Sequence, residues 1–376
     1  MGGGLRKKII ILGRGNAGCL SAMHFSHFRH FTNSKVDIEL IYDSKIKPVP
    51  TGQGTTLEFP LSLFHNFGSN FYKKFPVTLK TGIMYENWSK KDFFHPFPLG
   101  RYGLHFNPED FQNYVCNNLN VDFLEKDENI DDYSKLDADY IIDCRGTPKN
   151  LDSYDTLSNP LNCALLSTLP KKNNDVKWTR CVATPDGWCF YIPLPDKTSV
   201  GYLFNDQYTT VEKAKNNFKK LFKVKKINQV FPFKQYIAKK PIIDNRVLLN
   251  GNKLFFLEPL EATAMGTYLK VSKYYYSYIF ENWPKHIVEE EIKKYIIKIE
   301  NFILYHYSNG SIYKNKFWNY GKKLWKKTNT NSLDIHLNEL KKMNSIDIEK
   351  THSSEYEYAQ WPIWSIDLWR KNVIVK

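Results

Sequence analysis

The chain has 376 residues, of which 42% are hydrophobic and 15% aromatic, enough for two domains or one large elaborated domain with an ample core. Its formal net charge is +14, but the lysines and arginines are scattered, which gives little support to a nucleic-acid-binding protein. The six cysteines form no Cys-x-x-Cys pair and the apolar run 9–12 is far too short to cross a bilayer, which argues against a disulfide framework, a zinc site and a membrane span. We expect a soluble, cytoplasmic protein that binds no metal.

The first predicted element is an apolar strand over 7–12 that leads into a glycine turn and then a helix. This order is typical of a dinucleotide site, in which the glycines permit a tight turn, close approach to a pyrophosphate and close helix packing. These glycines are Gly13, Gly15 and Gly18. A second strand over 36–42 ends at Asp43, which is placed to accept hydrogen bonds from ribose hydroxyls. We predict a dinucleotide-binding region, with a purely structural turn as the weaker alternative.

A loop with hydroxyl side chains follows at Gly52–Thr56, and an imperfectly alternating strand at 77–88 comes after it. Gly82 interrupts that strand and indicates a bulge or a close approach of another segment. Lys80 lies inside the same, otherwise apolar stretch. Because most lysines are exposed to solvent, exposure is the default interpretation of Lys80 on these residues alone.

Further along, an aromatic loop at 93–98 precedes a helix predicted over 108–115, with Asn107 as its cap. The strand at 138–144 ends in a second glycine turn. From 176 to 204 the pattern predicts an antiparallel sheet, which forms either the floor of a substrate chamber or ordinary sheet core.

The stretch 256–266 combines features that point to chemistry. Pro259 ends any strand here because it lacks an amide hydrogen, and small residues then lead to Gly266, after which the chain is predicted to be helical. Free amides at a helix start attract anions, and the carboxylate of Glu261 lies in the same turn. The competing interpretation is a structural corner with a capping threonine and a solvated glutamate.

The C-terminal part is helical and aromatic. Helical segments are predicted at 274–280 and 288–304, and His306 is interpreted as a core histidine with satisfied hydrogen bonds rather than a catalyst. A charged stretch over 322–357 precedes a tryptophan-rich tail at 361–369.

Taken together, residues 7–320 resemble the flavin-dependent halogenases, the tryptophan-halogenase-like group related to the single-component flavin monooxygenases. Five stretches carry the resemblance, in one consistent order: the glycine motif Gly13–Gly18 with Asp43, Lys80 in Lys-x-Gly-Ile, Gly187–Pro193 for Trp-x-Trp-x-Ile-Pro, Glu258–Ala264 for Glu-Pro-Leu-Glu-Ser-Thr-Gly, and Phe302–Trp318. The chain departs from the family pattern at three positions. Phe190 replaces the second tryptophan, Ala264 replaces a glycine, and Gln53 stands where a glutamate is usual.

The resemblance implies a set of site residues. Lys80 and Glu261 would be catalytic, and the amides of Thr263 and Ala264 would hold a halide ion. The residues expected to bind flavin adenine dinucleotide (FAD) are Gly13, Gly15, Asn16, Ala17, Gly18, Asp43, Gly52, Gln53, Thr55 and Gly251. The residues expected to line the substrate pocket are Trp88, Phe94, His95, Trp188 and Phe190.

The implied fold is α/β with α+β elements: a Rossmann-like FAD-binding domain with an inserted antiparallel sheet and a C-terminal helical region, as in single-component flavin monooxygenases. We expect the FAD-binding part and the catalytic lysine in 1–165, and the β-sheet substrate region in 166–240. The chain would then return to the FAD domain with the halide-binding turn in 241–270, and 271–376 would form the helical region.

The implied reaction uses FADH2, dioxygen and chloride, bromide or iodide to make hypohalous acid, which Lys80 transfers to a small aromatic substrate of the indole, phenol or pyrrole type. No second glycine motif for a nicotinamide is present, so reduced flavin would come from a separate flavin reductase. No nucleic acid or membrane partner is expected, and a homodimer is left open. An FAD-dependent aromatic monooxygenase and a non-catalytic basic binding protein are the alternatives.

Overall fold

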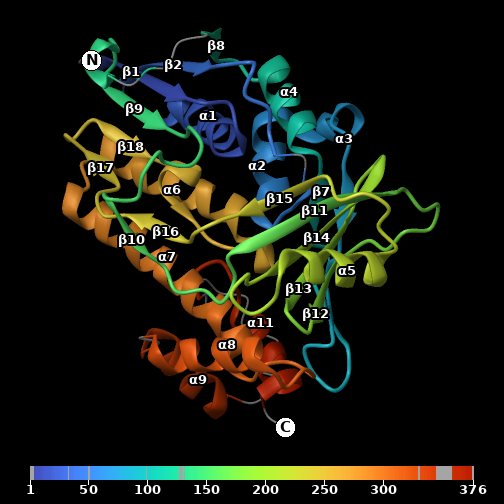
Figure 1. Cartoon of the computed structure of the whole chain (residues 1–376). Helices are drawn as coiled ribbons and strands as arrows, with labels where there is room; N and C mark the ends of the chain where they lie inside the picture. The colour runs from blue at the N-terminus through green and yellow to red at the C-terminus, as the bar shows by residue number, and fades with distance from the viewer. Residues whose placement is uncertain are drawn as a thin grey trace.

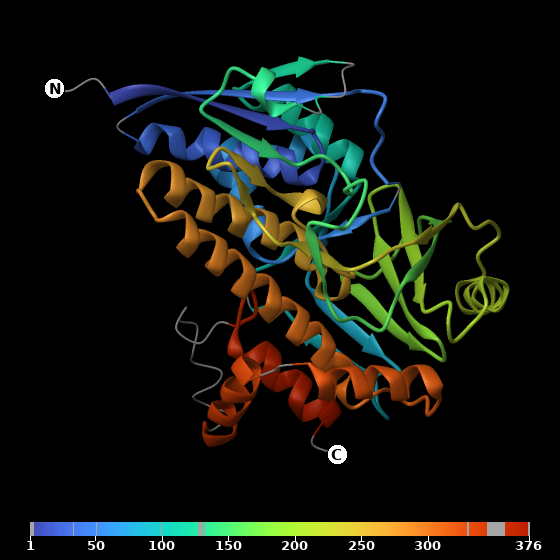
Figure 2. The same ribbon diagram turned by 60° about the vertical axis from the view of Figure 1, so that its left-hand side comes forward.

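The computed structural model describes residues 4–32, 34–49, 51–98, 100–126, 130, 132–328, 331–343 and 358–374. Two large sheets dominate the molecule, one at the top and one at the lower right of Figure 1. The long helix α7 (Lys285–Ser308) runs from the first sheet down to the C-terminal helices at the bottom, as both ribbon views show (Figures 1 and 2).

The first sheet has six strands and is almost entirely parallel. Its order is β17 (Ile242–Ile243), β18 (Val247–Leu249), β9 (Tyr140–Asp143), β1 (Gly4–Leu12), β2 (Ser34–Tyr42) and β8 (Asp122–Glu125). Only the β17–β18 pair is antiparallel among these strands. Strand β1 lies between β9 and β2, and its residues from Ile9 to Leu12 are buried, which explains why this second half of the strand is apolar without alternation.

The second sheet has seven strands and is antiparallel except between β12 and β5. Its order is β15 (Gln229–Pro232), β11 (Cys163–Pro170), β14 (Lys197–Phe204), β13 (Gly187–Pro193), β12 (Thr179–Thr184), β5 (Gly82–Glu86) and β6 (Phe93–Pro96). Helix α5 (Val211–Phe222) covers one face, where Cys189 and Tyr191 pack. Trp188 and Phe190 face the main core on the other side. The antiparallel sheet predicted for 176–204 is therefore present.

Two three-stranded sheets connect these layers. One consists of β10 (Tyr154–Thr156), β16 (Tyr236–Ala238) and β19 (Phe255–Phe256), and the other of β3 (Gln53–Gly54), β7 (Gly103–Phe106) and β4 (Thr78–Lys80). The strand predicted over 77–88 is thus divided between two sheets. The division falls before Gly82, where an added Cβ would lie 2.3 Å from the carbonyl oxygen of His95. Lys80 consequently lies where the two sheets meet.

Helices fill the remaining layers. Helix α1 (Asn16–Phe28) packs against α6 (Thr263–Phe280), which in turn packs against α7. The other α-helices are α2 (Glu58–Phe67), α3 (Phe71–Lys74), α4 (Pro108–Asn118), α8 (Lys316–Lys327), α9 (Asn331–Lys342) and α11 (Ile363–Trp369). Shorter turns of helix are η1 (Arg29–Phe31), η2 (Gly68–Asn70), η3 (Tyr133–Lys135), η4 (Gly251–Lys253), η5 (Leu260–Ala262) and the π-helical η7 (Arg370–Ile374).

Two local predictions differ from the structure. Helix α6 begins at Thr263 rather than after Gly266, because the backbone already turns at Glu261 and Ala262. Asn107 precedes α4 as predicted, but its side chain does not cap the helix and instead donates to the carboxylates of Asp110 and Asp196. The side-chain nitrogen thus donates to two charged acceptors, while the side-chain oxygen accepts from no helix amide.

The predicted fold class is confirmed: a Rossmann-like α/β region, an inserted antiparallel sheet and a C-terminal helical region are all present. How the chain divides into domains stays a prediction. Within the part that the structure describes, no helix combines the length and the apolar character that a membrane crossing requires.

Candidate active site

The glycine turn after β1 has the shape of a dinucleotide cradle. Gly13 adopts a φ of 91°, which favours glycine, and its N–H donates to the carbonyl of Ile41 at 2.7 Å. At Gly18, an added Cβ would lie 1.8 Å from the Gly13 carbonyl oxygen, so helix α1 packs this closely only because Gly18 has no side chain. Gly15 is exposed and has open space where its side chain would be.

The start of α1 leaves donors for an anion. The helix begins at Asn16 and no side chain caps it, so its first amides have no partner within the helix. The guanidinium of Arg14 lies over the Tyr42 ring, 4.4 Å from the centroid, and its buried Nε has no hydrogen-bond partner. Asp43 follows β2, and one of its oxygens accepts from the Lys45 amide at 2.8 Å. These groups fit a pyrophosphate and a ribose.

Two further loops reach this region. Gly251 lies against Ala17 of α1, and its N–H donates to the side-chain oxygen of Asn250 at 2.8 Å. The amide of Gly52 donates to Ser199 at 2.9 Å, which fixes the loop against the seven-stranded sheet, and Gln53 continues it as β3. The residues predicted to bind FAD thus come from the glycine turn, the end of β2, η4 and the β3 loop. This arrangement fits a dinucleotide except at Thr55, which is fully buried, and the binding role of these residues stays a prediction.

Lys80 ends β4 and its side chain is only 1% exposed. Its ammonium group donates to the carbonyl of Thr55 at 3.1 Å and lies 5.3 Å from the centroid of the Phe97 ring. The Thr55 hydroxyl accepts from the amide of Leu104 at 2.9 Å, so both polar groups of Thr55 are used within the protein. Burial lowers the pKa of Lys80 to about 8, against the opposing charge of Glu261.

The turn before α6 has a backbone that non-glycine residues rarely adopt. Glu261 has a φ of 67° and Ala262 a φ of 56°, both in the left-handed region. Successive amides around such residues form a concavity that suits anions, and here they belong to Thr263 and Ala264 at the uncapped start of α6. Ala264 lies inside the helix, so an alanine causes no backbone strain at the position where the family has glycine.

The Glu261 carboxylate is buried and accepts three hydrogen bonds. One comes from the Tyr85 hydroxyl, one from His306 Nε2 at 2.9 Å and one from Trp361 Nε1 at 3.1 Å. Burial alone would raise the pKa of Glu261, but the hydrogen bond and the charge of His306 outweigh it and lower the pKa to about 2. Glu261 is therefore ionised throughout the neutral range.

The partners of His306 determine its charge. Its Nδ1 lies 2.7 Å from the carbonyl oxygen of Phe302, and its Nε2 faces the ionised carboxylate of Glu261. Both partners are acceptors, so both ring nitrogens are placed to donate, as they do in an imidazolium. His306 is a buried histidine with satisfied hydrogen bonds, as predicted, but its pairing with Glu261 was not.

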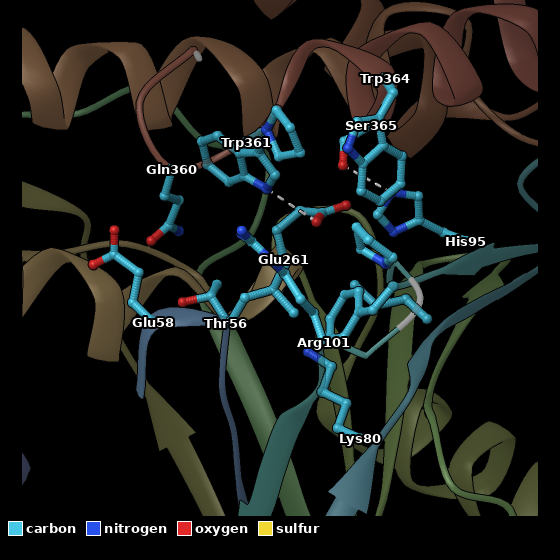
Figure 3. Close-up of a pocket in the computed structure, with 15 residues that line it drawn as sticks. Thr56, Glu58, Lys80, His95, Arg101, Glu261, Gln360, Trp361, Trp364 and Ser365 are labelled. Carbon is cyan, nitrogen blue, oxygen red and sulfur yellow. Dashed lines mark hydrogen bonds between the residues drawn. The ribbon is translucent and has the colours of Figure 1, made fainter. Parts of the chain in front are cut away.

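A cavity of about 140 Å³ joins the two predicted catalytic residues (Figure 3). Lys80 extends into it from the side opposite Trp361 and Trp364, and Glu261 lies between them. The lining residues are Thr56, Leu57, Glu58, Lys80, Ile83, His95, Phe97, Pro98, Arg101, Glu261, Gln360, Trp361, Pro362, Trp364 and Ser365. Three distant parts of the chain thus converge on one cavity.

Of the residues predicted to line a substrate pocket, His95 lines this cavity. Its Nε2 lies 2.8 Å from the Ser365 hydroxyl, and its ring stacks on that of Trp364 with centroids 4.8 Å apart. Burial lowers the pKa of His95 to about 4, so the ring is neutral near pH 7. The stack provides an aromatic wall beside Lys80.

The other four predicted pocket residues are not part of the cavity lining. Trp88 is buried in a cluster of aromatic rings and donates to the carbonyl of Cys181 at 3.0 Å. Phe94 is 38% exposed. Trp188 and Phe190 pack with ring centroids 6.4 Å apart, and Trp188 Nε1 donates to Glu258 at 2.7 Å. The role of these four residues in substrate binding stays a prediction.

Several residues of the site gave no sequence signal. Tyr85, His306 and Trp361 all bond to Glu261 although more than 50 positions separate Trp361 from His306 and more than 200 separate His306 from Tyr85. Arg101 lines the cavity from a loop without any motif. Two hints were visible: His306 lies in the family-like stretch Phe302–Trp318, and a buried tail rich in indoles needs a partner surface.

Comparison with known proteins identifies the family. The family model for tryptophan halogenase matches residues 8–134 and 121–361. The chain belongs to the tryptophan halogenase family. This confirms the family predicted from the motifs. A curated relative, the tryptophan 7-halogenase KtzQ of Kutzneria sp. (strain 744), is 28% identical over 156 residues, a match that spans 37% of this chain but only 28% of the length of the relative.

Solved structures of the family share the fold. MibH, described as a lathipeptide tryptophan 5-halogenase, superposes with a TM-score of 0.82 at 17% identity, covering all of this chain (100%) and 87% of its own. A tryptophan halogenase from Shewanella frigidimarina gives 0.78 at 18% identity, with 98% and 89% covered. The flavin-dependent halogenase Xcc4156 from Xanthomonas campestris gives 0.73 at 17% identity, with 84% and 80% covered. At such identities the likeness establishes the fold alone.

Proposed function

We propose that this member of the family is an FADH2-dependent halogenase that acts on an electron-rich aromatic small molecule of the indole, phenol or pyrrole type. The observation that carries the proposal is the single cavity lined by Lys80 and Glu261, two residues from motifs 181 positions apart. The dinucleotide cradle at Gly13–Gly18 supports a flavin cofactor. A monooxygenase would need neither the buried lysine nor the anion-binding turn at Thr263.

The residues that would hold FAD lie in the glycine turn, at Asp43, in the β3 loop and at Gly251. When bound in reduced form, FAD supplies two electrons, so that FADH2, O2, a halide ion and a proton give FAD, hypohalous acid and water. The amides of Thr263 and Ala264 would hold the halide at the start of α6, where no side chain competes for them. A separate reductase would provide the FADH2.

Lys80 would hold the hypohalous acid beside the acceptor. One ammonium hydrogen is used on the Thr55 carbonyl, which leaves donors for an oxygen atom in the cavity. As an ammonium, Lys80 polarises the oxygen–halogen bond by hydrogen bonding; as an amine, it displaces hydroxide and forms a haloamine. In either case the ring gains the halogen and loses a proton, and water is the second product.

Glu261 would take the proton that the ring loses. After halogen addition, the ring is a cationic arenium ion, which is such a strong acid that even a carboxylate with a pKa of about 2 deprotonates it. The low pKa also ensures that Glu261 is ionised at every working pH. Its negative charge, facing the ring, would stabilise the cation as it forms.

The test is mass spectrometry of small indoles and phenols incubated with the protein, FAD, a flavin reductase, NADH and one halide per reaction. We expect a halide-specific mass shift that disappears in Lys80→Ala, while FAD binding and FADH2 oxidation stay intact. Lys91→Ala, an exposed lysine beyond β5, serves as the matched control.

Two outcomes would refute the proposal. A gain of one oxygen regardless of halide would establish a monooxygenase, and regioselective halogenation by Lys80→Ala would remove the lysine from the mechanism. Rapid reduction of bound FAD by NADH alone would show that no separate reductase is needed.

A further inference from the structure

We propose that the acceptor is an aromatic carboxylic acid and that Arg101 binds its carboxylate. This inference rests on the proposed function, because it concerns the substrate of the same cavity. It names a specificity residue, Arg101, that none of the motifs contains. Five features of the cavity support it: the chemistry of its lining, the unpaired guanidinium, the charges nearby, two buried side chains without hydrogen-bond partners and the size of the space.

The cavity has an aromatic part and a polar part. Rings of Phe97, Trp361 and Trp364 provide the aromatic part, with His95 stacked on Trp364. The polar part holds side chains that carry hydrogen-bond donors, namely Thr56, Arg101 and Gln360. In Figure 3, Trp361 and Trp364 of the aromatic part and Gln360 of the polar part lie on the side of Glu261 away from Lys80. A ligand that satisfies both parts has a flat ring and a polar group that accepts hydrogen bonds.

Arg101 is the available cation. Its backbone amide donates to Pro98, but its guanidinium makes no hydrogen bond or ion pair with the part of the chain that the structure describes. Arg180, by contrast, forms a two-pronged pair with Glu86, with a nitrogen–oxygen distance of 2.8 Å for one prong. An arginine that lines a binding cavity and whose five donors have no partner among the described residues matches a carboxylate, which accepts two parallel hydrogen bonds.

The nearby carboxylates are already occupied. Glu58, at the rim of the cavity, pairs with Lys273 at 3.5 Å. Glu261 accepts from three donors, and its charge is balanced by the imidazolium of His306. The other cation of the lining, Lys80, is held by Thr55 and required for chemistry. An acidic ligand therefore finds Arg101 as its uncommitted partner at the mouth.

Unsatisfied buried atoms mark the same part of the cavity. The hydroxyl of Thr56 and both amide atoms of Gln360 are shielded from solvent and have no hydrogen-bond partner. The two side chains meet near Gly266, where an added Cβ would lie 2.2 Å from the Gln360 amide oxygen and 3.1 Å from the Thr56 hydroxyl. Buried polar atoms without partners are costly, so these atoms are poised for a ligand. A carboxylate that enters this part of the cavity would supply the acceptor that the Thr56 hydroxyl and the Gln360 amide nitrogen lack.

The size of the cavity limits the ring. Its volume of about 140 Å³ is close to that of engineered apolar cavities, on the order of 150 Å³, that bind benzene. One aromatic ring fills the space near Lys80, and a short substituent then reaches the exposed Arg101. Monocyclic acids such as hydroxyphenylacetic acid suit this arrangement, and a larger ring system would need the wall at Trp361 to move.

The experiment compares an acid with its amide, which has the same shape without the charge. We would measure the dissociation constants of 4-hydroxyphenylacetic acid and 4-hydroxyphenylacetamide by calorimetry, and their KM values by mass spectrometry, for the wild type and Arg101→Gln. Loss of charge-assisted hydrogen bonds should weaken binding of the acid about 10- to 100-fold and change that of the amide far less. Arg101→Lys should retain part of the preference for the acid.

Arg6→Gln, a similarly exposed arginine on β1, is the matched control and should leave both ligands unaffected. Equal binding of acid and amide by the wild type, equal losses for both in Arg101→Gln, or binding of neither would overturn the inference. Calorimetry needs no turnover, so the two proposals can fail separately. If the acid binds through Arg101 but no acceptor is halogenated, the anion site stands and the halogenase proposal falls.

Discussion

Two glutamates of the turn Glu258–Ala264, one at its start and one at its middle, differ in how readily they ionise. Glu258 and Glu261 are three residues apart and both are buried, at 0% and 7% exposure. Glu258 accepts from Asn159, Trp188 and Tyr307, all of them neutral donors, and burial raises its pKa to about 7. Glu261 also accepts three hydrogen bonds, yet its pKa falls to about 2.

The difference lies in the charge of one donor. Neutral donors offset only part of the cost of burying a carboxylate, whereas the imidazolium of His306 adds a full positive charge within hydrogen-bond distance. Glu258 therefore anchors the turn to Trp188 and the seven-stranded sheet, and it lies outside the cavity. Glu261 faces the cavity as a permanent anion. The number of hydrogen bonds alone does not set the protonation state of a buried carboxyl group, because the charge of its partners also shifts the pKa.

The largest loss of kcat should come from removing the charge of Glu261. We expect Glu261→Gln to lower kcat for halogenation by about 10²–10⁴-fold, because an amide cannot accept the proton of the arenium ion. Glu258→Gln also replaces a carboxyl by an amide, but outside the cavity. It should lower kcat by less than about tenfold, provided that the protein remains folded. Single-turnover rates for both variants provide the measurement, and similar losses would break the comparison.

Removing the positive charge of His306 should make the pKa of Glu261 resemble that of Glu258. In His306→Gln, Glu261 retains a hydrogen-bond donor but loses the charge, so its pKa should rise as that of Glu258 does. The rate should then fall as the pH is lowered from 7 to 5, a limb absent from the wild type. Breaking a buried ion pair should also cost about 3–5 kcal/mol of unfolding free energy.

Tyr85→Phe removes a neutral donor from the same carboxylate and is the control for His306→Gln. It should cost about 1–3 kcal/mol without adding the acidic limb to the pH–rate profile. An identical profile in both variants would show that the charge of His306 is irrelevant.

The pH–rate profile around pH 8 should reveal which form of Lys80 acts. The pKa of Lys80 is lowered to about 8, so the ammonium predominates below that pH and the amine above it. If the ammonium polarises hypohalous acid, kcat should fall about tenfold per pH unit above 8; if a haloamine forms, kcat should fall below 8 instead. A pyrrole acceptor has one ring and avoids the ionisation of phenols, and Lys80→Arg, which stays charged, should remove the transition in the first case.

The last prediction concerns the pH dependence of stability that Glu258 causes. The pKa of Glu258 is about 7 in the folded chain against an ordinary value of 4.5, so the folded state favours the protonated form. This contribution to stability is complete below pH 4.5 and is lost as the pH rises to 7, by about 3 kcal/mol in all. Urea unfolding of the wild type and Glu258→Gln at pH 5 and pH 7.5 measures it, and equal pH dependence in both would contradict it.

Much of this arrangement could be predicted from local sequence. The apolar run before Gly13 and the glycines after it specify a strand, a turn and a helix within 20 residues, and hydrophobic alternation identified the antiparallel sheet. Lys80 and Glu261 were found because each lies in a motif that resembles a known family. On composition alone, Lys80 would have been placed on the surface.

The remaining features depend on contacts that no local pattern encodes. His306 looked like a core residue because its sequence neighbours are apolar, and only the folded chain brings it to Glu261. Asn107 lies at a helix start, but a charged partner from a distant loop takes its side chain. The left-handed backbone of Ala262 was not predicted because alanine gives no signal for it, in contrast to glycine.

The cavity is lined by residues from three separate parts of the chain, at 56–101, at Glu261 and at 360–365. Activity therefore depends on contacts between residues far apart in sequence. Contacts between residues so far apart in sequence form late during folding, because each requires closure of a long loop. The wall that Trp361 provides belongs to the short segment 358–374, which contributes no strand to either large sheet. Such segments open at a lower free-energy cost than sheets do. On warming, catalysis should therefore cease before the sheets melt, and refolded chains should regain their sheet structure before they regain activity.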